Sequence, residues 1–146
     1  MEIYSNPVNY FVADFFGSPS MNLIPGEIVR ENDAVRFRSP CFEIALPEHF
    51  KTARPGAATL GIRPEHVGVA LGSDGEIELP VRLVEPLGRD TLLYFDAGIA
   101  RAFVAISEGL DMADVKIGAR MALSLDLRRL CLFAADGGRI GGATAC

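Results

Sequence analysis

The stretch "FVADFFGSPSMNLIPGEIV", from Phe11 to Val29, changes character at its midpoint. Its first half completes a helical pattern that begins at Asn6 and Pro7, with apolar residues at spacings of three and four. This pattern predicts a helix over residues 7–16, which Gly17 and Pro19 end. A helix of this length with three phenylalanines on one face needs a partner surface, because it is marginal alone in water. From residue 21 onward, the pattern of short apolar segments separated by turn residues predicts β-structure instead.

Short strands separated by turn residues fill the rest of the chain. Alternation in residues 34–39 predicts that Val35 and Phe37 face the core and that Arg36 and Arg38 face water. We expect strands at 21–29 (interrupted by a turn at Pro25-Gly26), 34–39, 41–47, 59–62, from 67, 76–88, 90–98, 100–106 and 120–134, the last as one strand or two. Residues 48–58 are expected to be a loop, residues 72–75 a hairpin turn, and residues 136–139 a turn. This rhythm predicts a mainly β fold, an OB-like barrel with a short N-terminal helix.

The bulk composition limits the possible functions. With 146 residues, 49% hydrophobic and 23% charged, the chain suits one soluble domain or two very small ones. Its net charge of -5 argues against a general nucleic-acid binder. The three cysteines are scattered, which predicts free thiols in a reducing compartment. No apolar stretch reaches the ~20 residues of a membrane span, and no signal peptide is recognisable. We expect a cytoplasmic chain.

The sequence contains none of the common catalytic motifs. It has no G-x-S-x-G nucleophile elbow, no dinucleotide fingerprint and no G-x-x-x-x-G-K-[ST] phosphate loop. Asp111 and Asp114 read as a solvated loop rather than a calcium site, and the two histidines do not cluster with the cysteines. We therefore predict that the chain is not an enzyme by itself and holds no cofactor or metal.

Two polar clusters are candidate interface or regulatory sites. In "GIRPEH", Arg63 and Glu65 flank Pro64, and if the segment is extended they point to the same side and can pair. Such a pair either braces a bend in the strand or contacts another subunit or a small ligand. In "EPLGRDTLLY", residues 85–94, Arg89 and Asp90 follow a tight corner. Their charges either solvate that corner or contact a subunit.

Four ordered motifs resemble one family. "EIYSNPVNYFVADFFGSPSMNLIPG", "LGIRPEHV", "VEPLGRDTLLYFDAG" and "LDLRRLCLFAADGGRI" look like the carboxy-terminal half of the ATPase subunit of sugar-type ABC importers. The resemblance covers residues 2 to about 140. It implies that residues 1–17 are the terminal helix and linker of a nucleotide-binding domain, that 18–140 form an OB-like regulatory module called TOBE, and that 141–146 are a tail. Leu127 and Cys131 depart from the family, which often has proline and histidine there.

The resemblance implies a non-catalytic regulatory and dimerisation domain. Its expected partners are a second copy, the nucleotide-binding domain of its own full-length subunit and, through that domain, permease subunits at the inner face of the membrane. A second hypothesis is a sensor of small ligands or oxyanions, with Thr91 and Ser107 as candidates that the sequence does not single out. A third is a nucleic-acid-binding OB barrel, which requires exposed aromatic side chains and basic neighbours.

Overall fold

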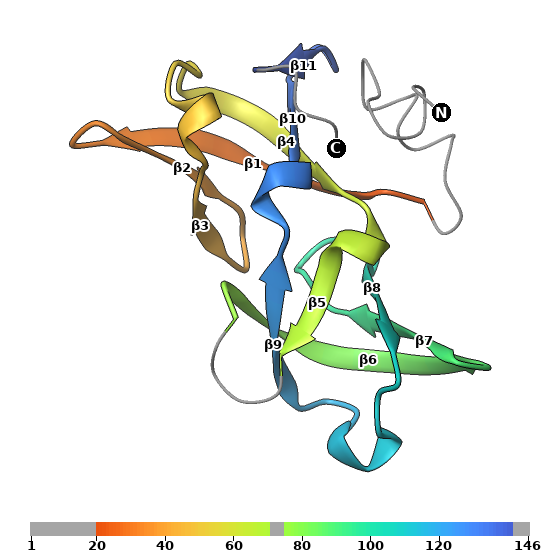
Figure 1. Cartoon of the computed structure of the whole chain (residues 1–146). Coiled ribbons are helices and arrows are strands. Elements are labelled where there is room, and N and C mark those ends of the chain that lie inside the picture. The colour runs from red at the N-terminus through yellow and green to blue at the C-terminus, as the bar shows by residue number, and fades with distance from the viewer. Residues whose placement is uncertain (1–19, 71–74, 142–146) are drawn as a thin grey trace.

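The computed structural model describes residues 20–70 and 75–141, and it contains two antiparallel sheets (Figure 1). The first sheet has the strand order β11-β10-β4-β1-β2-β3. Its strands are β1 (Asn22–Glu31), β2 (Ala34–Arg38), β3 (Glu43–Ala45), β4 (Gly56–Ile62), β10 (Cys131–Ala134) and β11 (Arg139–Ile140). The order brings the two ends of the described chain into one sheet.

The second sheet has the order β5-β9-β6-β7-β8. It consists of β5 (Val67–Ala70), β6 (Ile77–Leu87), β7 (Asp90–Phe95), β8 (Phe103–Glu108) and β9 (Arg120–Leu125). Its two edge strands, β5 and β8, also lie against each other, so the sheet nearly closes on itself. This is the mainly β, OB-like barrel that the sequence predicts. The predicted helix over residues 7–16 lies outside the described residues.

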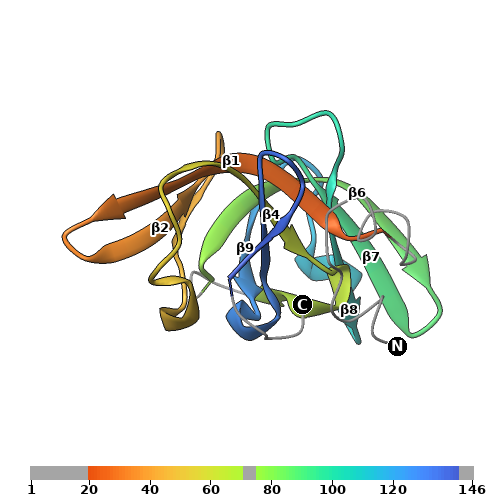
Figure 2. The same ribbon diagram turned by 90° about the horizontal axis from the view of Figure 1, so that it is seen from above.

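Four short 3-10 helices lie in the connections of the described chain, and two of them join one sheet to the other. The four are η1 (Glu48–Phe50), η2 (Pro64–His66), η3 (Met112–Asp114) and η4 (Leu127–Arg129). The connections β4–η2–β5 and β9–η4–β10 carry the chain from one sheet to the other, and both stand between the upper and lower halves of Figure 1. Viewed from above, β1 runs from β2 at one end of the molecule toward β7 and β8 at the other (Figure 2).

One hydrophobic core joins the two sheets. Ile28 and Leu60 of the first sheet belong to the same buried cluster as Leu93 and Leu123 of the second. Phe42 bridges them, because its ring lies 6.4 Å from the Phe37 ring and 6.4 Å from the Phe103 ring, edge-on to the latter. The predicted orientation of β2 is confirmed: Val35 and Phe37 are buried, Arg36 is half-buried and Arg38 is exposed.

The predicted turn at Pro25-Gly26 is wrong. Strand β1 continues through both residues, which pair with Thr59 and Ala58 of β4. Pairing with β2 begins only at Glu27, so Pro25 lies where β1 has a neighbour on one side. Position 26 requires glycine because neighbouring atoms pack closely against it, and not because the chain turns there. A Cβ atom there would overlap the Arg38 carbonyl oxygen and stand 2.6 Å from the Phe37 ring.

The hairpin turn expected at residues 72–75 lies almost entirely outside the described residues. Strands β5 and β6, on either side of it, do not pair with each other, and both pair with β9. The tight hairpins are elsewhere. Asn32 and Asp33, with φ of 47° and 68°, join β1 to β2, and both left-handed positions match a type I′ turn. Sequence reasoning overlooked this Asn-Asp signal.

Several element boundaries differ modestly from the prediction. The expected loop at residues 48–58 contains η1 and the first residues of β4, whereas residues 120–134 form two strands separated by η4, one of the two possibilities foreseen. The predicted turn at 136–139 is confirmed, since β10 and β11 form a hairpin across it. Cys41 is free, but Cys131 is disulfide-bonded, so the expectation of free thiols throughout is wrong for Cys131.

Candidate interaction surface

Arg63 and Glu65 lie at the passage from the first sheet to the second. Arg63 is extended, with φ of -77° and ψ of 148°, and Pro64 then begins the 3-10 helix η2. The segment is thus extended at Arg63 and coiled from Pro64 to His66, and the predicted pairing of Arg63 with Glu65 stays a prediction. Arg63 is 0% exposed and is the largest fully buried side chain among the described residues, whereas Glu65 is exposed. The arginine therefore belongs to the interior and the glutamate to the surface.

Arg89 and Asp90 lie at the free end of the β6–β7 hairpin. Gly88, with φ of 71°, and Arg89 form its two-residue turn, which confirms the predicted tight corner. The Arg89 guanidinium donates to the Glu108 carboxylate, with Nη2 and Oε1 2.8 Å apart. These side chains are 80% and 64% exposed, so the pair contributes at most about 1 kcal/mol. The hairpin end and η2 are separate elements, and the four predicted residues do not form a single site.

Asn22 is an important residue that sequence reasoning missed. Its Nδ2 donates to the carbonyl oxygen of Val104 at 2.8 Å, and its Oδ1 accepts from the Val104 N–H at 2.7 Å. The amide thus acts as an extra peptide group that ties β1 to the outer strand β8. Asn22 is 5% exposed, so both bonds are shielded from water. Its place in the quoted "SPSMN" was a signal, but a residue 82 positions away could not be foreseen as its partner.

The junction of η2 and η4 contains a partly buried histidine. The His66 carbonyl accepts from the Asp126 N–H at 2.9 Å, and the Asp126 carboxylate caps η4 by accepting from the Arg128 N–H. Burial lowers the pKa of His66, and the positive charges of Arg129 and Arg63 lower it further, against the opposing effect of Glu65 and Asp126. His66 Nδ1 is a buried atom with no hydrogen-bond partner among the described residues.

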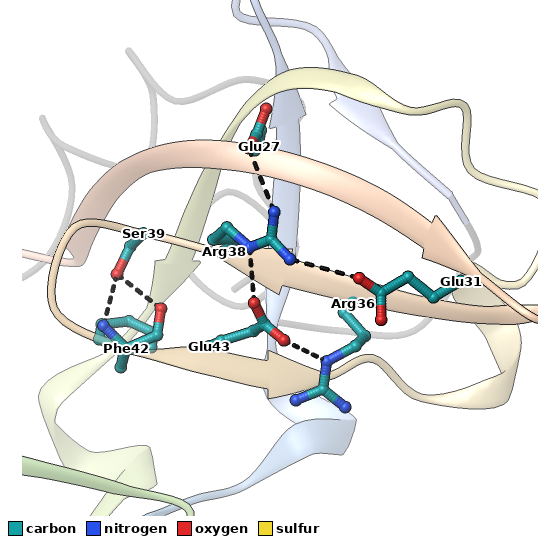
Figure 3. A network of polar contacts seen from close by, with 7 residues as sticks. All are labelled: Glu27, Glu31, Arg36, Arg38, Ser39, Phe42 and Glu43. Carbon is teal, nitrogen blue, oxygen red and sulfur yellow. Dashed lines mark hydrogen bonds and ion pairs between the residues drawn. The ribbon is translucent and has the colours of Figure 1, made fainter.

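Arg38 is the centre of an exposed charge cluster on β1, β2 and β3 (Figure 3). Its guanidinium faces Glu43 at 2.6 Å, Glu31 at 3.4 Å and Glu27 at 3.9 Å. Glu43 also accepts from Arg36 Nε at 2.6 Å. The hydrogen bond from Arg38, followed by that from Arg36, lowers the pKa of Glu43, and the bond to Glu43 raises the pKa of Arg38. The two arginines and three glutamates pair with one another across β1, β2 and β3, so this cluster braces the three strands.

Several pockets open on the described surface, among them one of about 370 Å³ beside Gly26, Arg38 and Pro40. One of about 250 Å³ lies beside Asn22, between the start of β1 and residues Tyr94, Arg101 and Val104. Another of about 380 Å³ lies between η1 and β11 and is lined mainly by apolar and backbone groups. No group of metal-ligating side chains occurs among the described residues. No helix within the described ranges is long and apolar enough to cross a membrane.

The aromatic side chains of residues 20–70 and 75–141 are mostly unavailable for stacking with nucleic-acid bases. Phe37, Phe95, Phe103 and Phe133 are 0% exposed, as expected for core residues. Tyr94 and Phe95 point to opposite sides, and only Tyr94 is partly exposed. The Tyr94 hydroxyl donates to Glu85 Oε1 at 3.3 Å. Burial and the charge of Glu85 raise the pKa of Tyr94. Nothing in this arrangement resembles the basic, aromatic face of a nucleic-acid-binding barrel.

The oxyanion candidates Thr91 and Ser107 are directly opposite each other on β7 and β8. Thr91 is 6% exposed and Ser107 is half-buried. On its other side, Thr91 pairs with Pro86 of β6. The fold therefore brings these two hydroxyl groups together, although the sequence alone did not distinguish them from other polar residues.

Comparison with known proteins agrees with this architecture. Residues 17–67 match the MalK OB fold domain, and residues 60–133 match the TOBE domain. The cytoplasmic molybdate-binding protein ModG, solved with molybdate bound, superposes with a TM-score of 0.58 over 76% of this chain and 94% of that one. At 13% identity, this likeness concerns the fold alone.

Relatives match the chain along nearly its whole length. The sn-glycerol-3-phosphate import ATP-binding protein UgpC of Chromohalobacter salexigens is 37% identical over 96% of this chain and 37% of its own. UgpC of Psychromonas ingrahamii is 33% identical over 93% and 36%. The maltose/maltodextrin import ATP-binding protein MalK of Vibrio vulnificus is 35% identical over 94% and 38%. The chain thus spans a little over a third of the length of these relatives. It belongs to the TOBE domain family, whose model matches residues 60–133, and it is similar to part of these sugar-type import ATP-binding proteins.

Proposed function

We propose that this chain is a non-catalytic regulatory and dimerisation unit of a sugar-type ABC importer ATPase. One observation carries the proposal: import ATP-binding proteins match 93–96% of this chain with only 36–38% of their own length. The sequence contains no phosphate-binding loop, so the unit does not hydrolyse ATP itself. The boundary near residue 17 separates it from the nucleotide-binding part of the subunit.

The proposed role is mechanical. A transport ATPase closes two nucleotide-binding domains on ATP and separates them after hydrolysis. A barrel on each subunit that pairs across the two-fold axis keeps the dimer together while the catalytic domains part. Its partners are a second copy, the nucleotide-binding domain of its own subunit and, through that domain, permease subunits on the cytoplasmic side of the membrane. An effector that prefers one arrangement of the barrels shifts the transport cycle.

Three of the four candidate residues predicted from the sequence are exposed, which suits a role in contacts between subunits. Arg89 and Asp90 lie at the exposed end of a hairpin, and Glu65 is exposed on η2. Each is available to a neighbouring subunit. Arg63 directly precedes η2 and is 0% exposed, which suits a structural role rather than a contact with a subunit. We therefore assign contact roles to Glu65, Arg89 and Asp90 and a structural role to Arg63.

Sedimentation equilibrium from about 5 to 500 μM tests self-association. A concentration-dependent dimer is the expected result, while a strict monomer at the highest concentration contradicts the dimerisation role. A parallel assay of phosphate release from ATP tests the non-catalytic assignment. Turnover by the purified chain above the buffer rate contradicts it.

A second candidate function is oxyanion sensing. It is favoured by the fold shared with a molybdate-binding protein and by the opposed hydroxyl groups of Thr91 and Ser107. A thermal-shift panel of molybdate, sulfate and phosphate, with maltose and glycerol-3-phosphate alongside, separates the two functions. A rise in Tm with molybdate that Thr91→Val and Ser107→Ala remove supports sensing. A flat panel contradicts it.

A further inference from the structure

Strands β6, β7 and β8 have an outer face that is buried at Leu92 (8% exposed) and Val104 (9% exposed) and open around Leu83 and Leu87. Register places three cross-strand rows on it: Leu83–Tyr94–Val104, Glu85–Leu92–Ile106 and Leu87–Asp90–Glu108. The alternate rows face inward, where Leu93, Phe103 and Ala105 are 0% exposed. On the outer face, Leu83 is 54% exposed and Leu87 is 55% exposed. We propose that a second copy of this chain docks on this face.

A β-bulge creates the face. The pairing of β6 with β7 shifts between Val81 and Leu83, so Arg82 is an extra residue. Val81 is 1% exposed, and Val84 packs against the same core. Without the bulge, Leu83 would follow Val81 inward, because residues two apart share a face. The Val81 N–H donates to the Ala119 carbonyl at 2.9 Å, and the Val81 carbonyl accepts from the Gly118 N–H at 2.7 Å, which fixes the bulge.

The two leucines are unusual within this molecule. Of the described residues, only three large hydrophobic side chains are exposed, and two of them occupy this one strand face. The third, Ile117, lies in the connection between β8 and β9 and is 62% exposed. An isolated exposed side chain of that kind is ordinary, whereas a pair on one strand above half-buried Tyr94 and Ile106 marks a contact surface.

The charges around the face favour a second copy over a partner of one sign. Its border contains the exposed cations Arg82 and Arg89 and the exposed anions Glu85, Asp90 and Glu108. In a two-fold interface each patch meets itself, so it must contain both signs to be complementary. A basic or acidic partner would meet like charges on such a border. The inference rests on the dimerisation role proposed above and assigns that role a surface.

The dimensions of the face predict a weak pairing. Three strands about 4.8 Å apart and some five residues long present roughly 15 Å by 17 Å. This footprint is well below the ~800 Å² per partner of a stable complex. Pairing of the isolated chain through this face should therefore be weak and depend on concentration. That strength is adequate where other domains of the same subunit hold the two copies close together.

Sedimentation equilibrium of Leu83→Lys and Leu87→Lys tests the surface, with Ile117→Lys as a matched control. All three changes place one cation at a side chain that is already exposed, so thermal unfolding should show folded proteins. We expect self-association to weaken at least tenfold in both leucine variants and to remain unchanged in Ile117→Lys. Equal association in all four proteins overturns the surface and leaves the dimerisation role intact. A monomeric native chain overturns both.

Hydroxyl-radical labelling of the native chain identifies the occupant directly. Leu83, Leu87 and Tyr94 should become protected as concentration rises from about 5 to 500 μM, while Ile117 stays labelled. Protection that is absent at all concentrations, and appears only when a separately produced nucleotide-binding domain of the subunit is added, contradicts the proposal. It would assign the face to that domain instead.

Discussion

Two polar stretches that look alike in the sequence have opposite places in the structure. In residues 61–66, Arg63 follows the buried residues Leu60 and Ile62 and is itself 0% exposed. In residues 85–94, Arg89 follows Gly88 at the end of a hairpin, and its side chain is 80% exposed. Polarity alone did not separate the two. What separates them is position, since one arginine ends a core strand where the chain passes between sheets and the other ends a hairpin.

Substituting each arginine by alanine in turn is the most direct test of this contrast between a buried and an exposed arginine. Arg63→Ala empties a fully buried volume and exposes its surroundings, so we expect unfolding free energy to fall by about 3 kcal/mol, as for large buried side chains. The matched change Arg89→Ala removes one exposed ion pair and should stay within about 0.5 kcal/mol. Urea denaturation measures both. Similar losses in the two variants would show that burial does not distinguish them.

Asn22 extends the contrast to an uncharged group. Asn22→Ala leaves the N–H and carbonyl of Val104 without these partners in a buried place, which should cost about 2 kcal/mol. Asn32→Gly is the control, because Asn32 lies in a left-handed turn that glycine also adopts. Urea denaturation should separate the two variants clearly. A loss below that of the control would mean that the tie between β1 and β8 is dispensable.

The local features of the fold were predictable from the sequence, and the long-range ones were not. Alternation fixed the inward faces of Val35 and Phe37, and turn residues marked most strand ends. The misreading of Pro25 and Gly26 shows the limit of local reasoning. Gly26 is required by the Phe37 ring packed over it, a contact between residues on different strands. Likewise, no local pattern reveals that β4 pairs with both β1 and β10.

The candidate residues show the same limit. Sequence reasoning found Arg89 and Asp90 at a corner, and the corner exists. It did not foresee the exposed leucines, because Leu83 faces outward only through the bulge at Arg82, and a bulge leaves no clear composition signal. The burial of Arg63 was hidden for a related reason. A charged residue in a polar motif is ordinarily at the surface, and only the packing of two sheets reverses this.

His66 is half-buried, so its exposure lies between that of buried Arg63 and that of exposed Arg89. Burial lowers its pKa below the ordinary 6.5, so the folded chain binds this proton less readily than the unfolded chain. Stability should therefore fall as pH drops below about 6.5, until the pH passes the lowered pKa of the folded state. Thermal unfolding between pH 7.5 and 5.5 should show a decline in Tm that His66→Gln reduces. His49→Gln, the change at the other histidine, should retain the decline, and equal behaviour of both variants would remove His66 as its source.

The smallest effect is expected at the exposed Arg38 cluster. The hydrogen bonds from Arg38 and Arg36 lower the pKa of Glu43, so its contribution is present above the ordinary value of 4.5 and is lost as pH falls through the lowered value. Glu43→Gln at pH 7 should lower Tm by only about 1–2 °C, because solvent and salt screen these charges. The difference should shrink further in 1 M NaCl, while the effect of Arg63→Ala should persist there. If salt instead removed the Arg63 effect and spared that of Glu43, the contrast between buried and exposed charge in this molecule would be reversed.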